Sequence, residues 1–212
     1  MGPRLRSPSE LTRRLQTAAA VAVTAFGLAA ALDAPLRAQS AQWTVRAGEV
    51  RVLCPLTVGG SFEAKTTTLS GVVSPGASPD DQWTGELVVD LNALDTGIDL
   101  RTRHMRDEYL ETGRGPEFAR AVLTGVHLDG IPPDTLGGKG GFAGRLRLHG
   151  VERPVRGQVE LRRAGRLVRV RASFPVVLAD FGIAKPRYLG VGVKDEVTVR
   201  VAFEAESAEN TR

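Results

Sequence analysis

Few residues of this chain have the spacing that catalysis or metal binding requires. The three histidines, His104, His127 and His149, lie far apart in the sequence, and Cys54 is the single cysteine. No HxxxH or Cys/His pattern therefore points to a zinc site. The sequence also lacks the Gly-x-Ser-x-Gly motif of a nucleophile elbow. We expect no catalytic residue, metal or cofactor, although a site assembled from distant residues stays as an alternative.

The elements that position any site are mostly strands. Alternating apolar and polar residues, rich in Val, Thr and Phe, predict about eight of them. In the segment 151–163, for example, Val155, Val159 and Leu161 alternate with charged or polar residues. The predicted strands are Trp43–Val45 with Val50–Cys54, Ser61–Val73, Gly85–Leu91, Ala121–Leu128, Phe142–His149, Val151–Arg163, Leu167–Leu178 and Val193–Ala205.

One segment, Leu100–Leu110, breaks the strand period. Its Met105, Tyr109 and Leu110 have helical spacing, and charged residues occupy the other side. Antiparallel strands with short turns and one short helical insertion predict an all-β fold, either a closed up-and-down barrel or a sandwich. Eight strands enclose an interior that is filled by side chains or that holds one small ligand.

The first 40 residues have the pattern of a signal peptide. Four arginines lie in the first 14 residues, Ala18–Leu32 is almost wholly apolar, and small residues flank Gln39. This apolar run is shorter than the ~20 residues of a membrane-spanning helix, so a retained anchor is the weaker alternative. We predict cleavage after residue 40 by the general or the twin-arginine route, a domain over 41–206, a polar tail over 207–212, and a periplasmic or secreted location without a transmembrane anchor.

Most of the net positive charge of the chain lies in this leader. The chain has 28 basic and 24 acidic residues, and five of the basic and two of the acidic residues precede residue 41. The remaining domain is nearly neutral, so we expect no nucleic-acid partner. Cys54 has no partner for an internal disulfide. Its alternating segment favours a buried strand position over a reactive thiol or an intermolecular disulfide.

Three ordered groups of motifs carry a resemblance to a known family. They are ALDTG at 93–97 followed by RDEYL at 106–110, GRLRLHGVERPV at 144–155, and DFGI at 180–183 followed by VKDEVTV at 193–199. In order and spacing, across residues 43–206, they resemble the YceI-like family of polyisoprenoid-binding proteins.

The resemblance implies an extended, antiparallel, eight-stranded lipocalin-like barrel whose apolar tunnel holds an isoprenoid chain or a similar amphiphile. Family members are typically periplasmic or secreted, and several are dimers, which makes a homodimer an expectation here. Five residues depart from the family pattern: Tyr109 replaces a histidine, Ala119 a proline, Leu123 an aromatic residue, Arg147 a threonine and Leu178 a basic residue. We expect Leu123 and Leu178 to reshape the tunnel.

Candidate ligand-binding residues follow from the inward faces of the strands. We predict an apolar tunnel, with Phe181 as a plug in a turn; ordinary barrel core is the alternative interpretation. Arg106 and Asp107 are candidates for contacting a polar head group or closing the tunnel mouth, or else form a surface pair. The tunnel candidates are Leu87, Val89, Leu91, Leu123, Phe142, Leu146, Leu148, Phe174, Val176, Phe181, Val197 and Val199.

The sequence therefore predicts a binding protein, not an enzyme, whose partner is an isoprenoid lipid or another amphiphile such as a quinone. The tail would leave water for a preformed apolar interior. Two alternatives stay open: a structural barrel with a filled interior, and a lipid-modifying enzyme with its site at the tunnel mouth. An outer-membrane barrel is disfavoured, because Arg156, Arg162, Arg169 and Arg171 lie on strands and arginine facing lipid at mid-bilayer costs ~2–4 kcal/mol.

Overall fold

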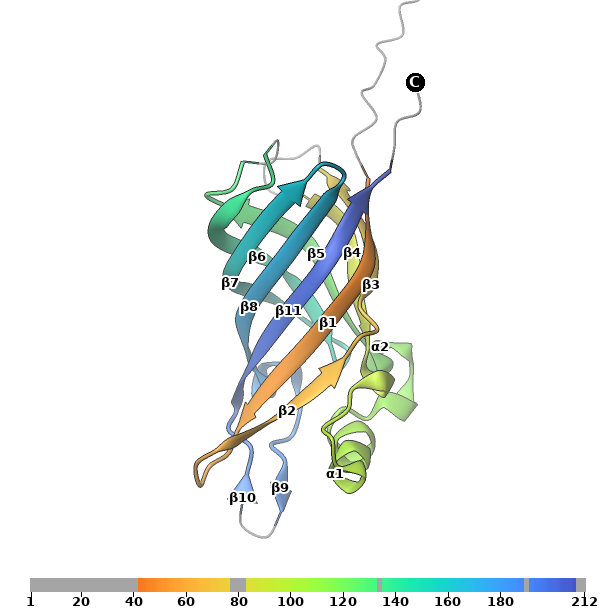
Figure 1. Cartoon of the computed structure of the whole chain (residues 1–212). Coiled ribbons are helices and arrows are strands. Elements are labelled where there is room, and N and C mark those ends of the chain that lie inside the picture. The colour runs from red at the N-terminus through yellow and green to blue at the C-terminus, as the bar shows by residue number, and fades with distance from the viewer. Residues whose placement is uncertain (1–41, 77–82, 133–134, 189–190, 209–212) are drawn as a thin grey trace, which may run out of the picture. The chain divides into compact units, whose positions relative to one another are not determined.

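The computed structural model describes residues 42–76, 83–132, 135–188 and 191–208. The predicted signal peptide and the last four residues of the predicted tail lie outside these described residues. The fold is mostly β, and the prediction of a closed, eight-stranded antiparallel barrel with a short helical insertion is confirmed (Figure 1). The sandwich alternative is wrong, because the two terminal strands pair with each other.

The barrel strands follow one another around the wall, and the pairing of β11 with β1 closes it. Val50 lies opposite Val201, for example, and Val52 opposite Val199. The strands are β1 (Trp43–Pro55), β2 (Ser61–Thr66), β3 (Ser70–Pro75), β4 (Trp83–Asp90), β5 (Arg120–Asp129), β6 (Gly138–Leu148), β7 (Val151–Ala164), β8 (Leu167–Val177) and β11 (Glu196–Ser207).

β2 and β3 together fill one place in the wall. β1 pairs with β2 through Val50–Pro55 and with β3 near Trp43, so both lie along the same edge of β1. The sequence predicted one unbroken strand, Ser61–Val73. The strand breaks because the Thr66 hydroxyl oxygen accepts a hydrogen bond from the Thr68 backbone N–H at 3.2 Å. Such local side-chain bonds compete with the ladder for backbone groups.

Alternation places apolar side chains inside the barrel and charged ones outside. Phe174 and Val176 of β8 and Val197 of β11 are buried. On the outer face Arg169 donates to Glu204 at 2.7 Å across the same two strands. Exposed pairs of this kind contribute about 0–1 kcal/mol each. The barrel is therefore stabilised mainly by its interior, at ~25 cal/mol per Å² of apolar surface removed from water.

Gly157 of β7 allows a close approach inside this interior. A Cβ atom at this position would lie 2.3 Å from the Ser173 carbonyl oxygen and 2.6 Å from the Phe174 Cβ. Phe142 and Phe174 pack edge to face in the same region, with ring centroids 5.5 Å apart. Any larger residue at 157 would have to displace β8 or this aromatic pair.

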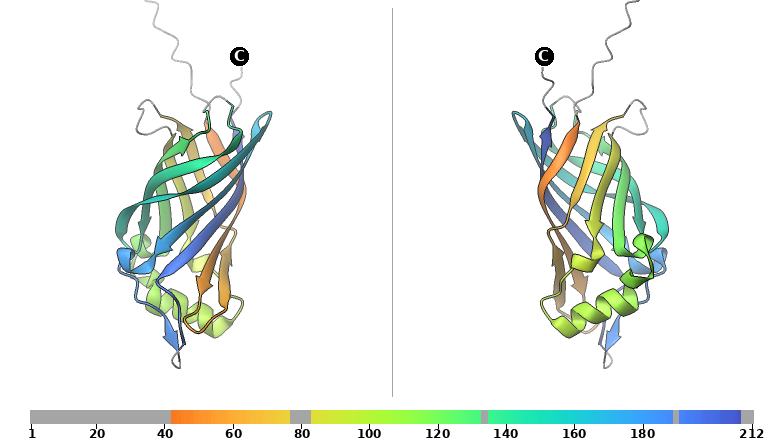
Figure 2. Two further views of the ribbon diagram at one scale, coloured as in Figure 1. Left: turned by 90° about the vertical axis from the view of Figure 1, so that its left-hand side faces the viewer. Right: turned by 90° about the vertical axis from the view of Figure 1, so that its right-hand side faces the viewer.

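The two ends of the barrel differ in construction. We call the end where β1 and β4 begin, with Trp43 and Trp83, the Trp end. The described chain starts and finishes there, and the Ala208 N–H donates to the Gln42 carbonyl at 2.8 Å. The opposite end, where β1 and β4 finish, carries two long insertions and is called the helical end (Figure 2).

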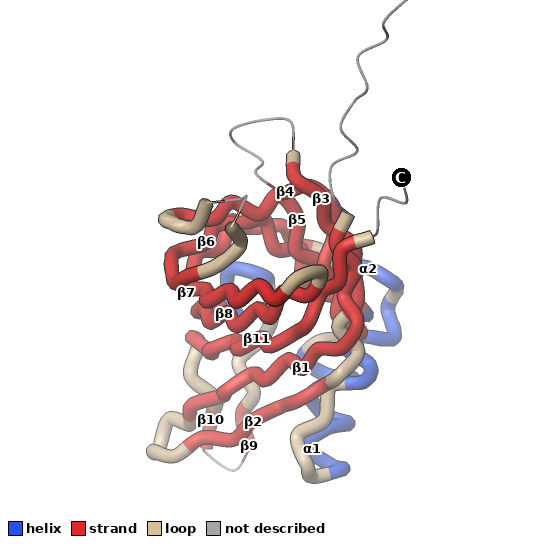
Figure 3. The backbone as a smooth tube through the Cα atoms, turned by 45° about the horizontal axis from the view of Figure 1, so that its top comes forward, coloured by secondary structure: helices blue, strands red, loops and turns tan. Residues whose placement is uncertain are grey.

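The helical insertion, residues 91–119, connects β4 to β5. The predicted helix over Leu100–Leu110 is present as α1 followed by a π-helical turn, in which the Leu110 N–H donates to the Met105 carbonyl at 2.9 Å. The helical elements of this insertion lie on one side of the helical end (Figure 3). They are η1 (Leu91–Ala93), α1 (Asp99–His104), η2 (Met105–Tyr109), η3 (Thr112–Arg114) and α2 (Pro116–Ala119).

The hairpin insertion, residues 178–195, connects β8 to β11. It begins with the turn η4 (Leu178–Phe181), as predicted for the DFG segment, and Gly182 follows with φ 69°. It then forms a small ladder of β9 (Arg187–Tyr188) and β10 (Val191–Gly192). Neither this ladder nor α2 could be predicted from the sequence, because elements of two to four residues are too short to show a period.

Candidate functional site

The barrel encloses a cavity of about 800 Å³. This volume lies in the upper part of the range of about 300–1,000 Å³ that is usual for small-molecule sites. All barrel strands contribute to its lining, which is almost wholly apolar. Eleven of the twelve predicted tunnel residues line it: Leu87, Val89, Leu91, Leu123, Phe142, Leu146, Leu148, Phe174, Val176, Val197 and Val199.

Phe181, the twelfth candidate, is buried but does not line the cavity. It is 2% exposed, and its carbonyl oxygen lies 3.1 Å from Nδ1 of His149. Its side chain therefore belongs to the packing of the helical end. Of the positions where the chain departs from the family pattern, Tyr109, Leu123 and Leu178 line the cavity.

At the Trp end several lining residues are almost fully buried. Trp43 is 4% exposed, Trp83 6%, and Leu136 of the β5–β6 connection 3%. The indole Nε1 of Trp83 is itself buried and has no hydrogen-bond partner among the described residues. A buried tryptophan usually finds an acceptor for this N–H group, so the Trp end has an unsatisfied donor beside the cavity.

At the helical end the cavity lining reaches the surface. Ile98 and Leu100 at the start of α1 are 54% and 49% exposed, and both line the cavity. Arg187 of β9 lies on the hairpin side of the same opening and is also exposed. The backbone N–H of Arg187 donates to the Tyr109 hydroxyl at 3.3 Å, which connects the two insertions beside the cavity.

Arg101 is the best-positioned cation at this opening. Its guanidinium carbon lies 4.2 Å from the centroid of the Phe62 ring, and its Nη2 donates to the Thr96 carbonyl at 2.8 Å. Its Nε is buried and without a partner. His104 and Arg187 also line the cavity, whereas no carboxylate is found among the described lining residues. The polar part of the lining therefore favours an anionic or acceptor-rich group.

A local network holds α1 in place. One oxygen of the Asp95 carboxylate accepts from the Gly97 N–H and the Thr102 hydroxyl, both at 2.9 Å. These bonds to the ionised form lower the pKa of Asp95. The Asp95 backbone also pairs with Lys65 of β2 at 2.7 and 2.8 Å. Residues 95–97 thus form a turn that leads into α1 and anchors the helical insertion to the barrel wall.

Arg106 and Asp107, the predicted head-group residues, lie away from the cavity lining. Arg106 donates from Nε and Nη2 to the Leu94 carbonyl, at 3.1 and 2.8 Å. Asp107 is exposed, and neither residue lines the cavity. A role of these two residues in binding stays a prediction, while the geometry places Arg101 and His104 of the preceding turn at the opening.

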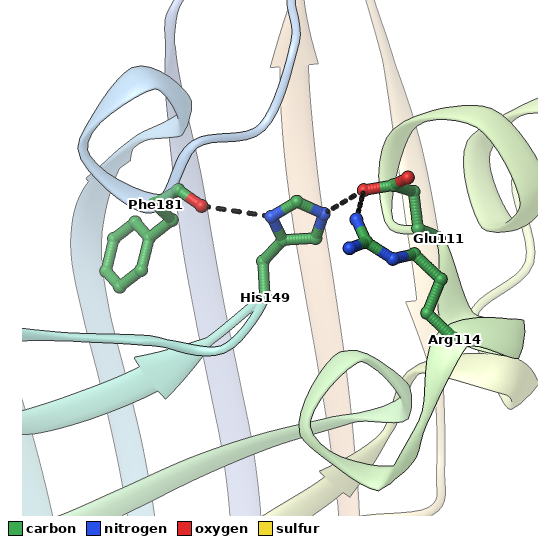
Figure 4. A network of polar contacts seen from close by, with 4 residues as sticks. All are labelled: Glu111, Arg114, His149 and Phe181. Atoms are coloured by element: carbon green, nitrogen blue, oxygen red, sulfur yellow. Dashed lines mark hydrogen bonds and ion pairs between the residues drawn. The ribbon is translucent and has the colours of Figure 1, made fainter.

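His149 joins the two insertions (Figure 4). It follows β6 in a tight turn with Gly150, at φ 53° and 74°. Its Nε2 lies 2.9 Å from Oε2 of Glu111, and the same oxygen accepts from Arg114 at 2.8 Å. Each ring nitrogen of His149 thus faces an oxygen atom, one from each insertion. The Arg114 and His149 contacts lower the pKa of Glu111.

Cys54 is a buried residue of β1, as predicted, and it lines the cavity near Arg101. Burial raises the pKa of its thiol to about 11, while the charge of Arg101 acts in the opposite direction. Such a thiol is a weak nucleophile near neutral pH, because the thiolate is the reactive form. Among the described residues, no group of three His, Cys, Asp or Glu side chains could hold a metal ion.

These features belong to a known family. The YceI-like domain profile matches residues 32–205, and the chain is a member of the YceI-like family. None of the curated proteins matches the chain. In the part of the chain that the structure describes, no helix is long and apolar enough to cross a membrane.

Several solved structures are similar to the chain, and two of them show the fold clearly. The chain is similar to a polyisoprenoid binding domain from Saccharophagus degradans that is implicated in plant cell wall breakdown, with 20% identity over 78% of this chain and 98% of that chain and a TM-score of 0.59. It is also similar to BcnA from Burkholderia cenocepacia, with 15% identity over 74% of this chain and 95% of that chain and a TM-score of 0.57.

Proposed function

We propose that this protein is an exported binding protein that sequesters or carries an isoprenoid lipid or a quinone-like amphiphile in the barrel cavity. The observation that carries the proposal is the cavity of about 800 Å³ with its almost wholly apolar lining. A prenyl chain needs no directional partners, and each Å² of apolar surface that it removes from water contributes ~25 cal/mol. The similar domain from Saccharophagus degradans, described as polyisoprenoid binding, agrees with this ligand class.

The opening at the helical end suits a polar head group. Arg101, His104 and Arg187 line the cavity there, and Arg101 keeps an unsatisfied Nε donor. A cation with free donors and no nearby carboxylate in the lining favours phosphate or carbonyl oxygens. Binding then places the chain inside the barrel and the head group at the opening, and release follows when the two insertions separate.

Export is the second part of the proposal. The arginine-rich start, the short apolar run and the small residues that flank Gln39 support a cleaved leader. A periplasmic or secreted lipid carrier is a consistent combination, because a long prenyl chain needs protection from water wherever it crosses an aqueous compartment.

Mass spectrometry on the mature protein, purified without detergent, tests both parts. We expect a chain that begins near residue 41 and a stoichiometric isoprenoid or quinone, seen in the native mass and after solvent extraction. A ligand-free protein that stays free after incubation with prenyl lipids would overturn the carrier function and favour a filled structural barrel. A native mass that includes the leader would overturn the export prediction without affecting the binding prediction.

A further inference from the structure

Two buried side-chain nitrogens without a hydrogen-bond partner lie in the described part of the protein, and both belong to residues that line the cavity. One is Nε of Arg101 at the helical end, and the other is Nε1 of Trp83 at the Trp end. The head group proposed above accounts for the first. The second lies far from it. Trp43 is in register, through Val73, with Gly85, two residues after Trp83. From Trp43 to Cys54, whose thiol senses the charge of Arg101, β1 runs for roughly 35 Å at about 3.3 Å per residue.

Among the described residues, none accepts a hydrogen bond from the Trp83 indole N–H. At the Trp end the other described lining residues carry apolar side chains, apart from Trp43, whose indole is likewise a donor and cannot accept. An ordered water is a poor substitute, because buried waters need two to four polar partners. An oxygen atom of the molecule that occupies the cavity can supply the missing acceptor.

We propose that the Trp end is a second polar subsite, which takes a neutral hydrogen-bond-accepting oxygen of the occupant through Nε1 of Trp83. The proposal rests on the carrier function above and narrows its ligand class: the part of the molecule that is buried deepest carries an oxygen atom. This oxygen is the carbonyl of a prenylated quinone that enters ring first, or a hydroxyl at the far end of a chain whose head group stays at Arg101. A bare hydrocarbon terminus leaves the indole donor unsatisfied, which costs affinity.

The test compares Trp83→Phe, which removes the N–H and keeps an aromatic ring, with Trp43→Phe as the matched control. Four probes are titrated: a prenylated benzoquinone, squalene as an isoprenoid hydrocarbon without oxygen, geranylgeranyl phosphate, and its ω-hydroxylated counterpart. We expect Trp83→Phe to weaken the quinone or the ω-hydroxylated probe about 3–10-fold, and to change squalene and geranylgeranyl phosphate less than twofold. Loss confined to the quinone indicates ring-first entry, and loss confined to the ω-hydroxylated probe indicates a chain-end oxygen.

The wild-type protein gives an independent readout. It contains two tryptophans, so two indole N–H signals are expected by NMR, and the Trp83 signal should move downfield with an oxygenated probe and not with squalene. Equal effects of Trp83→Phe on all four probes, or an indole signal that responds alike to squalene and quinone, would overturn the subsite and leave the carrier function intact. Failure of the wild-type protein to bind any probe would overturn both.

Discussion

The Trp end and the helical end close the same cavity in different ways. At the Trp end the lining residues sit mostly on strands, and Trp43 and Trp83 are almost fully buried. At the helical end the opening is formed by two insertions that meet through a few side-chain contacts, such as those of His149 and Tyr109. The difference teaches that the wall and the Trp end determine whether the barrel folds and binds a chain, whereas the insertions determine access and head-group choice.

The largest effect is expected from a charge in the wall between the two ends. Phe174→Asp places a carboxylate beside Phe142 in an apolar interior. An unpaired buried charge should cost about 4 kcal/mol or more of unfolding free energy, which abolishes folding or ligand retention. Ser173→Asp is the matched control, because Ser173 is the neighbouring residue of β8 and lies opposite Arg200. A folded Phe174→Asp protein with unchanged lipid binding would contradict the tunnel assignment.

A smaller effect, a loss of folding stability, is expected from His149→Ala. This change removes both side-chain contacts of His149 to the insertions and leaves an alanine at φ 53°. We expect a loss of about 2–3 kcal/mol and a Tm lower by roughly 4–10 °C, measured by thermal denaturation. His149→Asn should recover part of this loss, because Asn tolerates positive φ. An unchanged Tm in His149→Ala would mean that the insertions are held by other contacts.

Binding selectivity distinguishes the two arginines of the helical insertion. Arg101→Ala should leave the fold intact and weaken binding of geranylgeranyl phosphate about tenfold, because a hydrogen bond to a charged group is worth about 1.5–3 kcal/mol. Arg106→Ala should lower the unfolding free energy by about 1 kcal/mol through the unsatisfied Leu94 carbonyl, with little change in affinity. The opposite pattern would restore Arg106 as the head-group residue.

The smallest effect is a pH dependence at the helical end. The pKa of Glu111 is lowered by Arg114 and His149, so its contribution to stability is present above the unfolded pKa of about 4.3 and is lost as the pH falls through the lower folded value. Denaturant midpoints measured from pH 6 to pH 3 should therefore fall less steeply in Glu111→Gln than in the wild type. Parallel profiles would show that Glu111 is not coupled to folding.

The sequence predicted the wall far better than the opening. Alternation alone placed residues such as Leu146 and Phe174 on the inner face. Successive side chains of a strand point to opposite faces of the sheet, so the apolar set of each strand faces the barrel interior. At the opening, the family motif drew attention to Arg106. Arg101 was missed, although it precedes Met105 by four residues and Tyr109 by eight, which places it on the same helical face. This spacing is the sequence feature that could have identified Arg101 as a residue of the opening.

Other features could not be read from the sequence. The partners of His149 lie 38 and 32 residues away, at Glu111 and Phe181, and no local pattern connects them. The unsatisfied Trp83 indole is likewise a property of the assembled cavity. Contacts that depend on how distant segments meet are specified by the closed barrel and not by any window of the sequence.

Both insertions leave and rejoin the barrel at neighbouring positions. Asp90 at the end of β4 lies opposite Arg120 at the start of β5, and Val177 at the end of β8 lies opposite Glu196 at the start of β11. Each insertion is thus attached to two residues that already face each other across the ladder. Evolution or protein engineering can therefore exchange either segment for another of different length or charge while the pairing of the barrel strands stays the same. The same barrel can thus acquire a new ligand selectivity when the insertions at its opening are exchanged.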